Sequence, residues 1–115
     1  MKIHITARHF KAPSELQRYA ETAVYGLSQT YEGIVSADIV LEERPRGGGG
    51  KVAEVMLSVY REQLIAREAS HDIKMSVQAC VDKLERQLRR YKAKLHAGQH
   101  PGGAPRLADD GLAGE

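Results

Sequence analysis

Four basic side chains are spaced along one flank of a single predicted helix, which the sequence places at residues 72–94. Separations of three, four and four residues bring these four onto the same side of a helix: Lys83, Arg86, Arg90 and Lys94. The acids Asp82 and Glu85 fall on the opposite flank, where Glu85 lies four residues before Arg89 and can pair with it. A row of cations with no acid on its own helix face attracts polyanions, and RNA is the commonest one in the cytoplasm. The spacing therefore predicts an RNA-binding surface, with a merely solvated helix face as the alternative.

The same helix carries an apolar stripe that would hold this basic row in place. Its members recur every three or four residues: Val77, Val81, Leu84, Leu88, Tyr91 and Leu95. Asp72 precedes the stripe and can cap the helix, since its carboxylate accepts from exposed backbone N–H groups. We therefore expect the helix to begin after Asp72 and to pack on a core through Leu84 and its neighbours.

The basic character of the chain is concentrated in this helix. Residues 72–96 contain seven Lys/Arg and three Asp/Glu, a net charge of +4, whereas residues 1–71 contain nine of each. The single cysteine, Cys80, excludes an intramolecular disulfide, and its place beside the stripe predicts a buried, inert thiol. No apolar run approaches the ~20 residues of a membrane span, and Met1–Ala7 reads as a strand rather than a signal peptide. We expect a cytoplasmic protein without a membrane partner.

The sequence predicts six helices and strands, of which the basic helix is the last. The hydrophobic pattern predicts a strand at 2–6, a helix from 13 to 31, strands at 37–42, 53–60 and 63–69, and the basic helix at 72–94. Gly26 lies inside the first helix and Gly33 is placed to end it. A flexible glycine-rich hairpin loop is expected at 44–50 and a short turn at Arg61-Glu62. Residues 97–115, rich in Gly, Pro and acids, are expected to form a disordered tail.

These elements predict one α+β domain at residues 1–96. Three consecutive strands joined by short turns form an antiparallel meander, and one sheet face can cover the apolar stripes of both helices. The opposite sheet face, with Glu54, Ser58 and Arg67, would meet water. The predicted architecture is a two-layer β-α-β-β-β-α sandwich, with a four-stranded sheet and two helices packed on one face.

Motifs for catalysis or metal binding do not emerge from the sequence. The glycine run before Lys51 resembles a phosphate-binding P-loop, but Val52 stands where that motif needs Ser or Thr, and a strand begins there instead of a helix. The five histidines show no zinc-binding spacing. We therefore expect no enzymatic activity, no cofactor, no metal and no small-molecule substrate. Tyr25 and Tyr60 are left as candidates for stacking on bases.

The basic helix resembles the last helix of the ribosome hibernation-promoting factors. This family includes ribosome-associated inhibitor A and is also called the sigma-54 modulation protein family. The matching segments are Asp82-Lys-Leu84, Arg86-Gln-Leu88 and Lys92-Ala-Lys-Leu95. The opening Ile3-His-Ile-Thr6, the spacing from Leu16 to Tyr31 and the order of elements are similar too, so the resemblance covers residues 1–96.

The resemblance implies a fold similar to the double-stranded-RNA-binding fold and a ribosome-binding translation inhibitor. Such a protein would occupy the decoding channel of the small ribosomal subunit, contact its ribosomal RNA and preserve idle ribosomes under stress. The residues implied in RNA binding are Lys83, Arg86, Arg89, Arg90, Lys92, Lys94 and Arg18. The chain is similar to the short members of the family, and we expect the free protein to be monomeric. The alternatives are an RNA-binding domain that acts off the ribosome and a module that binds an acidic protein through its basic helix.

Overall fold

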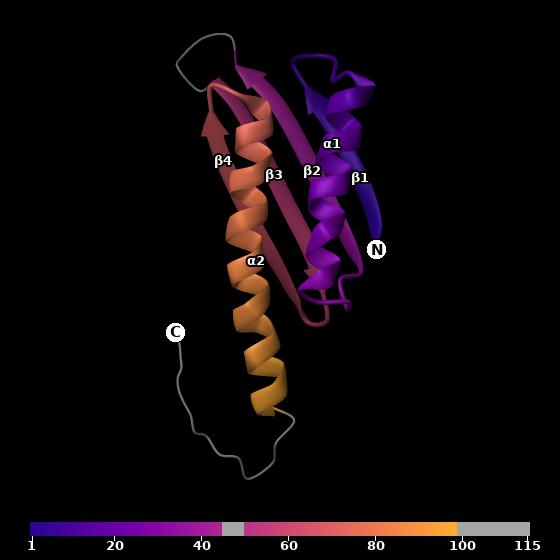
Figure 1. Cartoon of the computed structure of the whole chain (residues 1–115), viewed down its shortest axis with the longest axis vertical. Coiled ribbons are helices and arrows are strands. Elements are labelled where there is room, and N and C mark those ends of the chain that lie inside the picture. Colours follow the sequence, from indigo (N-terminus) through magenta and orange to yellow (C-terminus); the bar gives the residue numbers. More distant parts are fainter. Residues whose placement is uncertain (45–49, 99–115) are drawn as a thin grey trace.

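The protein folds into a four-stranded sheet covered on one face by two helices (Figure 1). The computed structural model describes residues 1–44 and 50–98. Its elements are β1 (Lys2–Arg8), α1 (Ser14–Tyr25), the short 3-10 helix η1 (Gly26–Gln29), β2 (Ser36–Arg44), β3 (Gly50–Val59), β4 (Glu62–Ser70) and α2 (Ile73–Gly98). Their order confirms the predicted β-α-β-β-β-α arrangement and the two-layer α+β class.

The strands lie in the order β1-β2-β3-β4 across the sheet. β2, β3 and β4 form the expected antiparallel meander, in which Ile39 lies beside Val55 and Val55 beside Ala66. β1 pairs with β2 in parallel, because α1 carries the chain back to the starting end of the sheet between these two strands. β1 and β4 are therefore the edge strands of this sheet, and α2 lies over the β4 side (Figure 1).

The core lies between the sheet and the two helices. Alternate residues of each strand point into it, so that Val55 and Leu57 are fully buried while their neighbours face outward. From α2 the stripe residues Val77, Leu84 and Leu88 are fully buried. Val81 and Leu95, at the margins of the predicted stripe, are only partly buried against the core. The buried face of α2 is thus turned slightly from the predicted stripe and includes Cys80.

Two local predictions were wrong. The first α-helix ends at Tyr25, and the chain continues as η1 from Gly26, a residue with low helix propensity. Gly33 is therefore not a helix cap; the Tyr31 side chain lies so close to it that a Cβ at this position would overlap the ring. The turn between β3 and β4 is formed by Tyr60 and Arg61, one residue earlier than expected, and Glu62 already belongs to β4.

The N-terminus of α2 is capped as predicted. The Asp72 carboxylate accepts from the backbone N–H of Lys74 at 2.9 Å. The buried Ser76 hydroxyl donates to the Lys51 carbonyl at 2.7 Å, which ties the first turn of α2 to β3. These bonds fix where the basic helix starts relative to the sheet.

Parts of two predicted segments lie outside the described residues. α2 includes residues 97 and 98, and the remainder of the expected tail, 99–115, is not among the residues described. The same holds for 45–49 of the expected glycine-rich loop. Within the described ranges, no helix is long and apolar enough to cross a bilayer.

Candidate nucleic-acid interface

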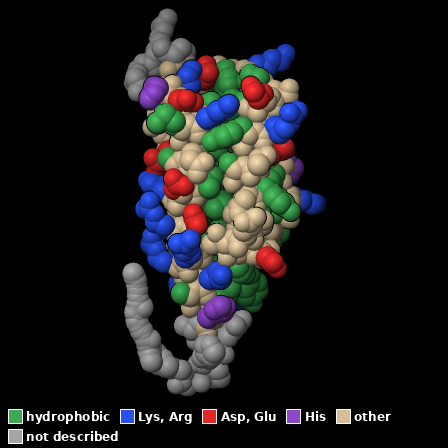
Figure 2. Space-filling view, in the orientation of Figure 1, with side chains coloured by type: hydrophobic (Ala, Val, Ile, Leu, Met, Phe, Trp, Pro, Cys, Tyr) green, Lys and Arg blue, Asp and Glu red, His purple; other side chains and the backbone are tan. Residues whose placement is uncertain are grey.

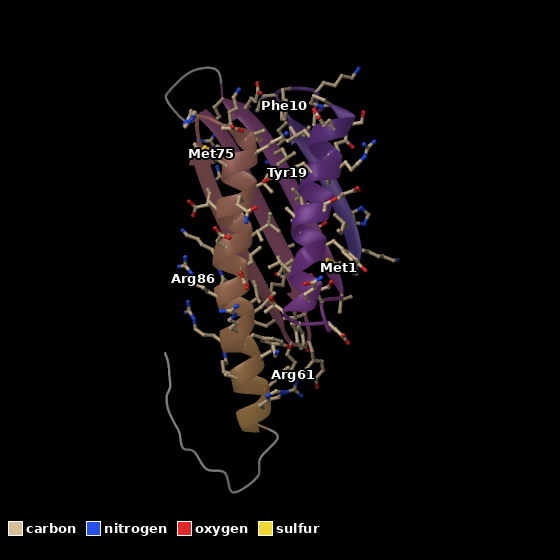
Figure 3. All side chains as sticks on the ribbon, in the orientation of Figure 1. Met1, Phe10, Tyr19, Arg61, Met75 and Arg86 are labelled. Carbon is tan, nitrogen blue, oxygen red and sulfur yellow. The ribbon has the colours of Figure 1, made fainter. Side chains whose placement is uncertain are left out.

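The predicted basic row lies on an exposed flank of α2. Lys83, Arg86, Arg90 and Lys94 are all exposed and follow one another down the helix on the side away from α1. Lys and Arg side chains gather there along the margin of the molecule (Figure 2). Arg86 lies on the side of α2 away from α1 (Figure 3). The structure therefore brings these four predicted residues together on one surface, named here the basic row.

The basic row is not free of acids, which corrects the expectation from the helix alone. The β4 residue Glu68 forms an ion pair with Lys83, and Glu62 pairs with Lys94, with 3.8 Å between Nζ and Oε1. Lys83 and Lys94 occupy the side of the row nearest the sheet, where β4 passes beneath α2. The prediction considered the residues of the helix alone, so it could not take account of acids on a neighbouring strand. A signal was present nonetheless, since Glu62 and Glu68 alternate in phase with the buried Leu64 and Ala66 and so face the helix.

Arg86 and Arg90 are the cations of the row that remain unpaired. Among the residues that the structure describes, neither side chain takes part in an ion pair or a hydrogen bond. Both are exposed, so each guanidinium can present its fork of N–H donors to a phosphate without first leaving a carboxylate. These two arginines form the centre of the candidate interface.

The other three predicted residues occupy different surroundings. Arg89 pairs with Glu85 at 2.8 Å, as its spacing predicted. Lys92 is partly buried and its Nζ donates to the Thr30 carbonyl at 3.1 Å, which directs it toward the end of η1 instead of the row. Arg18 is exposed on α1, the neighbouring helix. Their part in RNA binding stays a prediction.

The sheet holds α2 through polar contacts as well as apolar ones. Gln87 donates from its side chain to the Ile65 carbonyl of β4 at 3.0 Å. The Cys80 thiol lies 3.2 Å from the Ala53 carbonyl and is fully buried, as expected. Burial raises the pKa of this thiol from 9.0 to about 12, so it remains protonated and unreactive at neutral pH. The basic row therefore lies on a helix that is held in place on the sheet.

A shallow hollow of about 380 Å³ adjoins the lower part of the basic row. Its lining comes from the start of β4 and from α2: Glu62, Leu64, Gln87, Arg90, Tyr91 and Lys94. The residues described contain no cluster of three or more His, Cys, Asp or Glu side chains that could hold a metal ion. The exposed cations along α2 form a positively charged surface suited to a polyanion, and the hollow adjoins that surface beside Arg90, with Glu62 also in its lining.

Comparisons with known proteins identify the family of this chain. The family model described as sigma 54 modulation protein / S30EA ribosomal protein matches residues 3–96 of the 115. The N-terminal domain of Protein Y from Thermus thermophilus is 22% identical, with a TM-score of 0.68, over 79% of this chain and 99% of that one. A ribosomal subunit interface protein from Coxiella burnetii is also 22% identical, with a TM-score of 0.72, over 81% of this chain and 99% of that one. Both structures share the fold, and the match over residues 3–96 confirms the family resemblance: the chain belongs to the sigma 54 modulation protein / S30EA ribosomal protein family.

Proposed function

We propose that this protein binds the small ribosomal subunit, occupies its decoding channel and inhibits translation, so that idle ribosomes are preserved. Membership of the S30EA ribosomal protein family supports the ribosome as partner. The observation that carries the proposal is the pair of exposed arginines at the centre of the basic row, Arg86 and Arg90, which have no ion-pair partner within residues 1–44 and 50–98.

The basic row has the dimensions of a backbone-binding surface. From Lys83 to Lys94 the helix rises about 16 Å at 1.5 Å per residue. At the ~3.4 Å that separates successive charges along one strand of B-form DNA, that length corresponds to about five backbone phosphates. Arg86 and Arg90 would bind ribosomal RNA phosphates directly, and Lys83 and Lys94 would bind them after leaving Glu68 and Glu62. A rigid helix held on ribosomal RNA in this way would exclude messenger and transfer RNA from the channel.

Charge reversal at the two free arginines tests this proposal. We expect Arg86→Glu combined with Arg90→Glu to abolish co-sedimentation with purified small subunits, because each change removes a phosphate contact and adds repulsion. Both side chains are exposed, so the melting temperature should stay close to that of the parent. A matched control is Lys2→Glu with Arg8→Glu, which makes the same change in net charge on β1, the opposite edge of the sheet.

The outcomes separate the proposal from its alternatives. Loss of binding in the α2 variant but not in the β1 variant supports the proposed surface. Equal loss in both would mean that only net charge matters, and undiminished binding by the α2 variant would refute the surface. Parent protein that binds free RNA but not small subunits would indicate an RNA-binding domain that acts off the ribosome. Binding to neither, with capture of an acidic protein, would indicate a protein-interaction module. Addition of messenger RNA and transfer RNA should displace the bound parent if it occupies the decoding channel.

A further inference from the structure

An exposed tyrosine forms the tip of the turn between β3 and β4. The Tyr60 side chain is 61% exposed, although the preceding residue, Val59 of β3, is buried in the core. The guanidinium of Arg61 lies 5.3 Å from the centre of the Tyr60 ring, within the range of a cation–π contact. An aromatic ring that faces solvent beside an arginine is the pair of groups that proteins use to stack on unpaired bases.

The backbone of Arg61 is held in a conformation that arginine seldom adopts. Its φ is +68°, in the left-handed region where a side chain meets the backbone and where Gly or Asn is usual. This two-residue turn joins Val59 and Glu62, which face each other in the β3–β4 ladder. A glycine at this position would satisfy the turn without steric cost. The turn geometry itself does not require arginine, whose contact within the fold is the one with the exposed Tyr60 ring, whereas a binding surface gains a cation.

The Tyr60–Arg61 turn is fixed to α2 by a hydrogen bond. The Tyr91 hydroxyl donates to the Tyr60 carbonyl at 2.6 Å, and the Tyr91 ring is buried in edge-to-face contact with Tyr31, at 5.4 Å between ring centres. Burial and the neighbouring Tyr31 raise the pKa of Tyr91, so its hydroxyl remains a donor at neutral pH. The turn therefore keeps a defined place relative to the helix that carries the basic row, as its position beside the lower half of α2 shows (Figure 3).

The hollow described above lies between the lower end of the basic row and the residue that follows the turn. Arg90 and Lys94 line it from α2, and Glu62, the residue directly after the turn, lines it from β4. Lys94 reaches across to Glu62. Lys94, at the end of the row, is therefore in contact with the residue that follows the turn, while Arg61 itself lies on the side of α2 opposite to Arg86 (Figure 3). An RNA strand bound on the row would have to cross the lower end of α2 to reach the turn.

We propose that the Tyr60–Arg61 turn is a stacking site for an unpaired RNA base, whose flanking phosphates lie on Arg90 and Lys94. Tyr60 provides the aromatic ring, and Arg61, which lies over that ring, provides a cation beside the base. This inference rests on the proposed binding of ribosomal RNA through the basic row and adds a preference for unpaired over helical RNA, because only an unstacked base can reach the ring.

Substitutions at the ring test the site on small ribosomal subunits. Removal of one base-stacking side chain typically costs ~1–3 kcal/mol, so Tyr60→Ala should weaken binding roughly 5- to 150-fold. Tyr60→Phe should bind like the parent, whereas Tyr60→Leu, which is apolar but not aromatic, should not restore it. The matched control is Tyr25→Ala, which changes the other tyrosine predicted as a stacking candidate. Tyr25 is 59% exposed but has no arginine on its ring among the residues described, so we expect this variant to bind like the parent. Equal binding by Tyr60→Ala and parent, or restoration by leucine, would overturn the proposal.

Arg61→Gly separates a binding role from a structural one. We expect its melting temperature to equal or exceed that of the parent, because glycine adopts the left-handed conformation without strain, while its affinity for small subunits falls. An unchanged affinity would exclude Arg61 from the site.

A fluorescent probe reports stacking directly. The chain contains no tryptophan, so Tyr60→Trp introduces a single indole, and Tyr25→Trp provides the control. Titration with single-stranded poly(A) should quench the indole at position 60 and leave the one at position 25 unchanged, and a 12-base-pair RNA duplex should quench neither. Binding without quenching at position 60, or no binding of poly(A), would refute the stacking site. If Arg86→Glu with Arg90→Glu binds small subunits normally, the proposed function fails instead, whatever the indole reports.

Discussion

Replacing Glu62 and Glu68 with glutamine tests how far the two β4 carboxylates weaken the binding of the basic row to phosphates. The four cations of the row carry a charge of +4, and these two β4 carboxylates reduce it to +2 through their contacts with Lys94 and Lys83. Glutamine keeps the size of each side chain and removes its charge. We expect the double variant to bind small subunits more tightly than the parent, because Lys83 and Lys94 no longer exchange a carboxylate for a phosphate.

The magnitude follows from the two ion pairs. An exposed pair is worth ~0.2–1 kcal/mol, so the release of two pairs should tighten binding by roughly 2- to 30-fold. Each neutralised phosphate contributes about −0.7 to −0.9 to the slope of log K against log salt. Lys83 and Lys94 exchange a carboxylate for a phosphate when the parent binds, so four phosphates are neutralised in both proteins and the row should give each a slope of roughly −2.8 to −3.6.

The assay is equilibrium binding of labelled protein to small subunits between 50 and ~300 mM salt, with slopes compared between variants. Glu21→Gln with Glu54→Gln is the matched control, since it makes the same charge change on α1 and on the outer face of the sheet. Tighter binding with an unchanged slope, confined to the β4 variant, would support the reasoning. Tighter binding by the control as well would show that only net charge acts, and an unchanged affinity in both variants would mean that Lys83 and Lys94 do not contact phosphates.

Two further predictions concern the support of the basic helix. Leu84→Ala should lower the free energy of unfolding by ~2–5 kcal/mol, because Leu84 is fully buried, and an unchanged urea melt would mean that α2 does not pack as described. Stability should also fall in alkali because of the Cys80 thiol, whose pKa is raised from 9.0 to about 12 in the folded protein. Above pH 9 the unfolded state loses this proton while the folded state keeps it. The contribution of the thiol to the free energy of unfolding is therefore complete below pH 9 and is lost between pH 9 and 12. At pH 10.5 the parent should have lost about 2 kcal/mol more than Cys80→Ala relative to pH 8, by urea unfolding, and equal losses in the two proteins would contradict the assignment.

Periodicity was enough to predict most of the fold. The alternation of Val55 and Leu57 with polar neighbours in β3, and the three- and four-residue spacing of Val77, Leu84 and Leu88 in α2, are properties of the local chain. Such patterns depend only on strand and helix geometry, so they can be recognised before any tertiary contact is known. Local rules were less reliable at element ends, where Gly26 begins η1 and the Tyr31 ring lies against Gly33.

The sequence by itself determined that four cations share one face of a basic helix, because that depends on residue spacing alone. It did not determine which of them are free. Glu62 and Glu68 precede the row by more than ten residues and come within ion-pair distance only because β4 passes beneath α2. The same packing places the Tyr60–Arg61 turn against Tyr91, 31 residues away in the chain. Charge spacing is a local property, whereas ion pairing and the placement of Tyr60 beside α2 require strand and helix to be brought together, which only the tertiary structure decides.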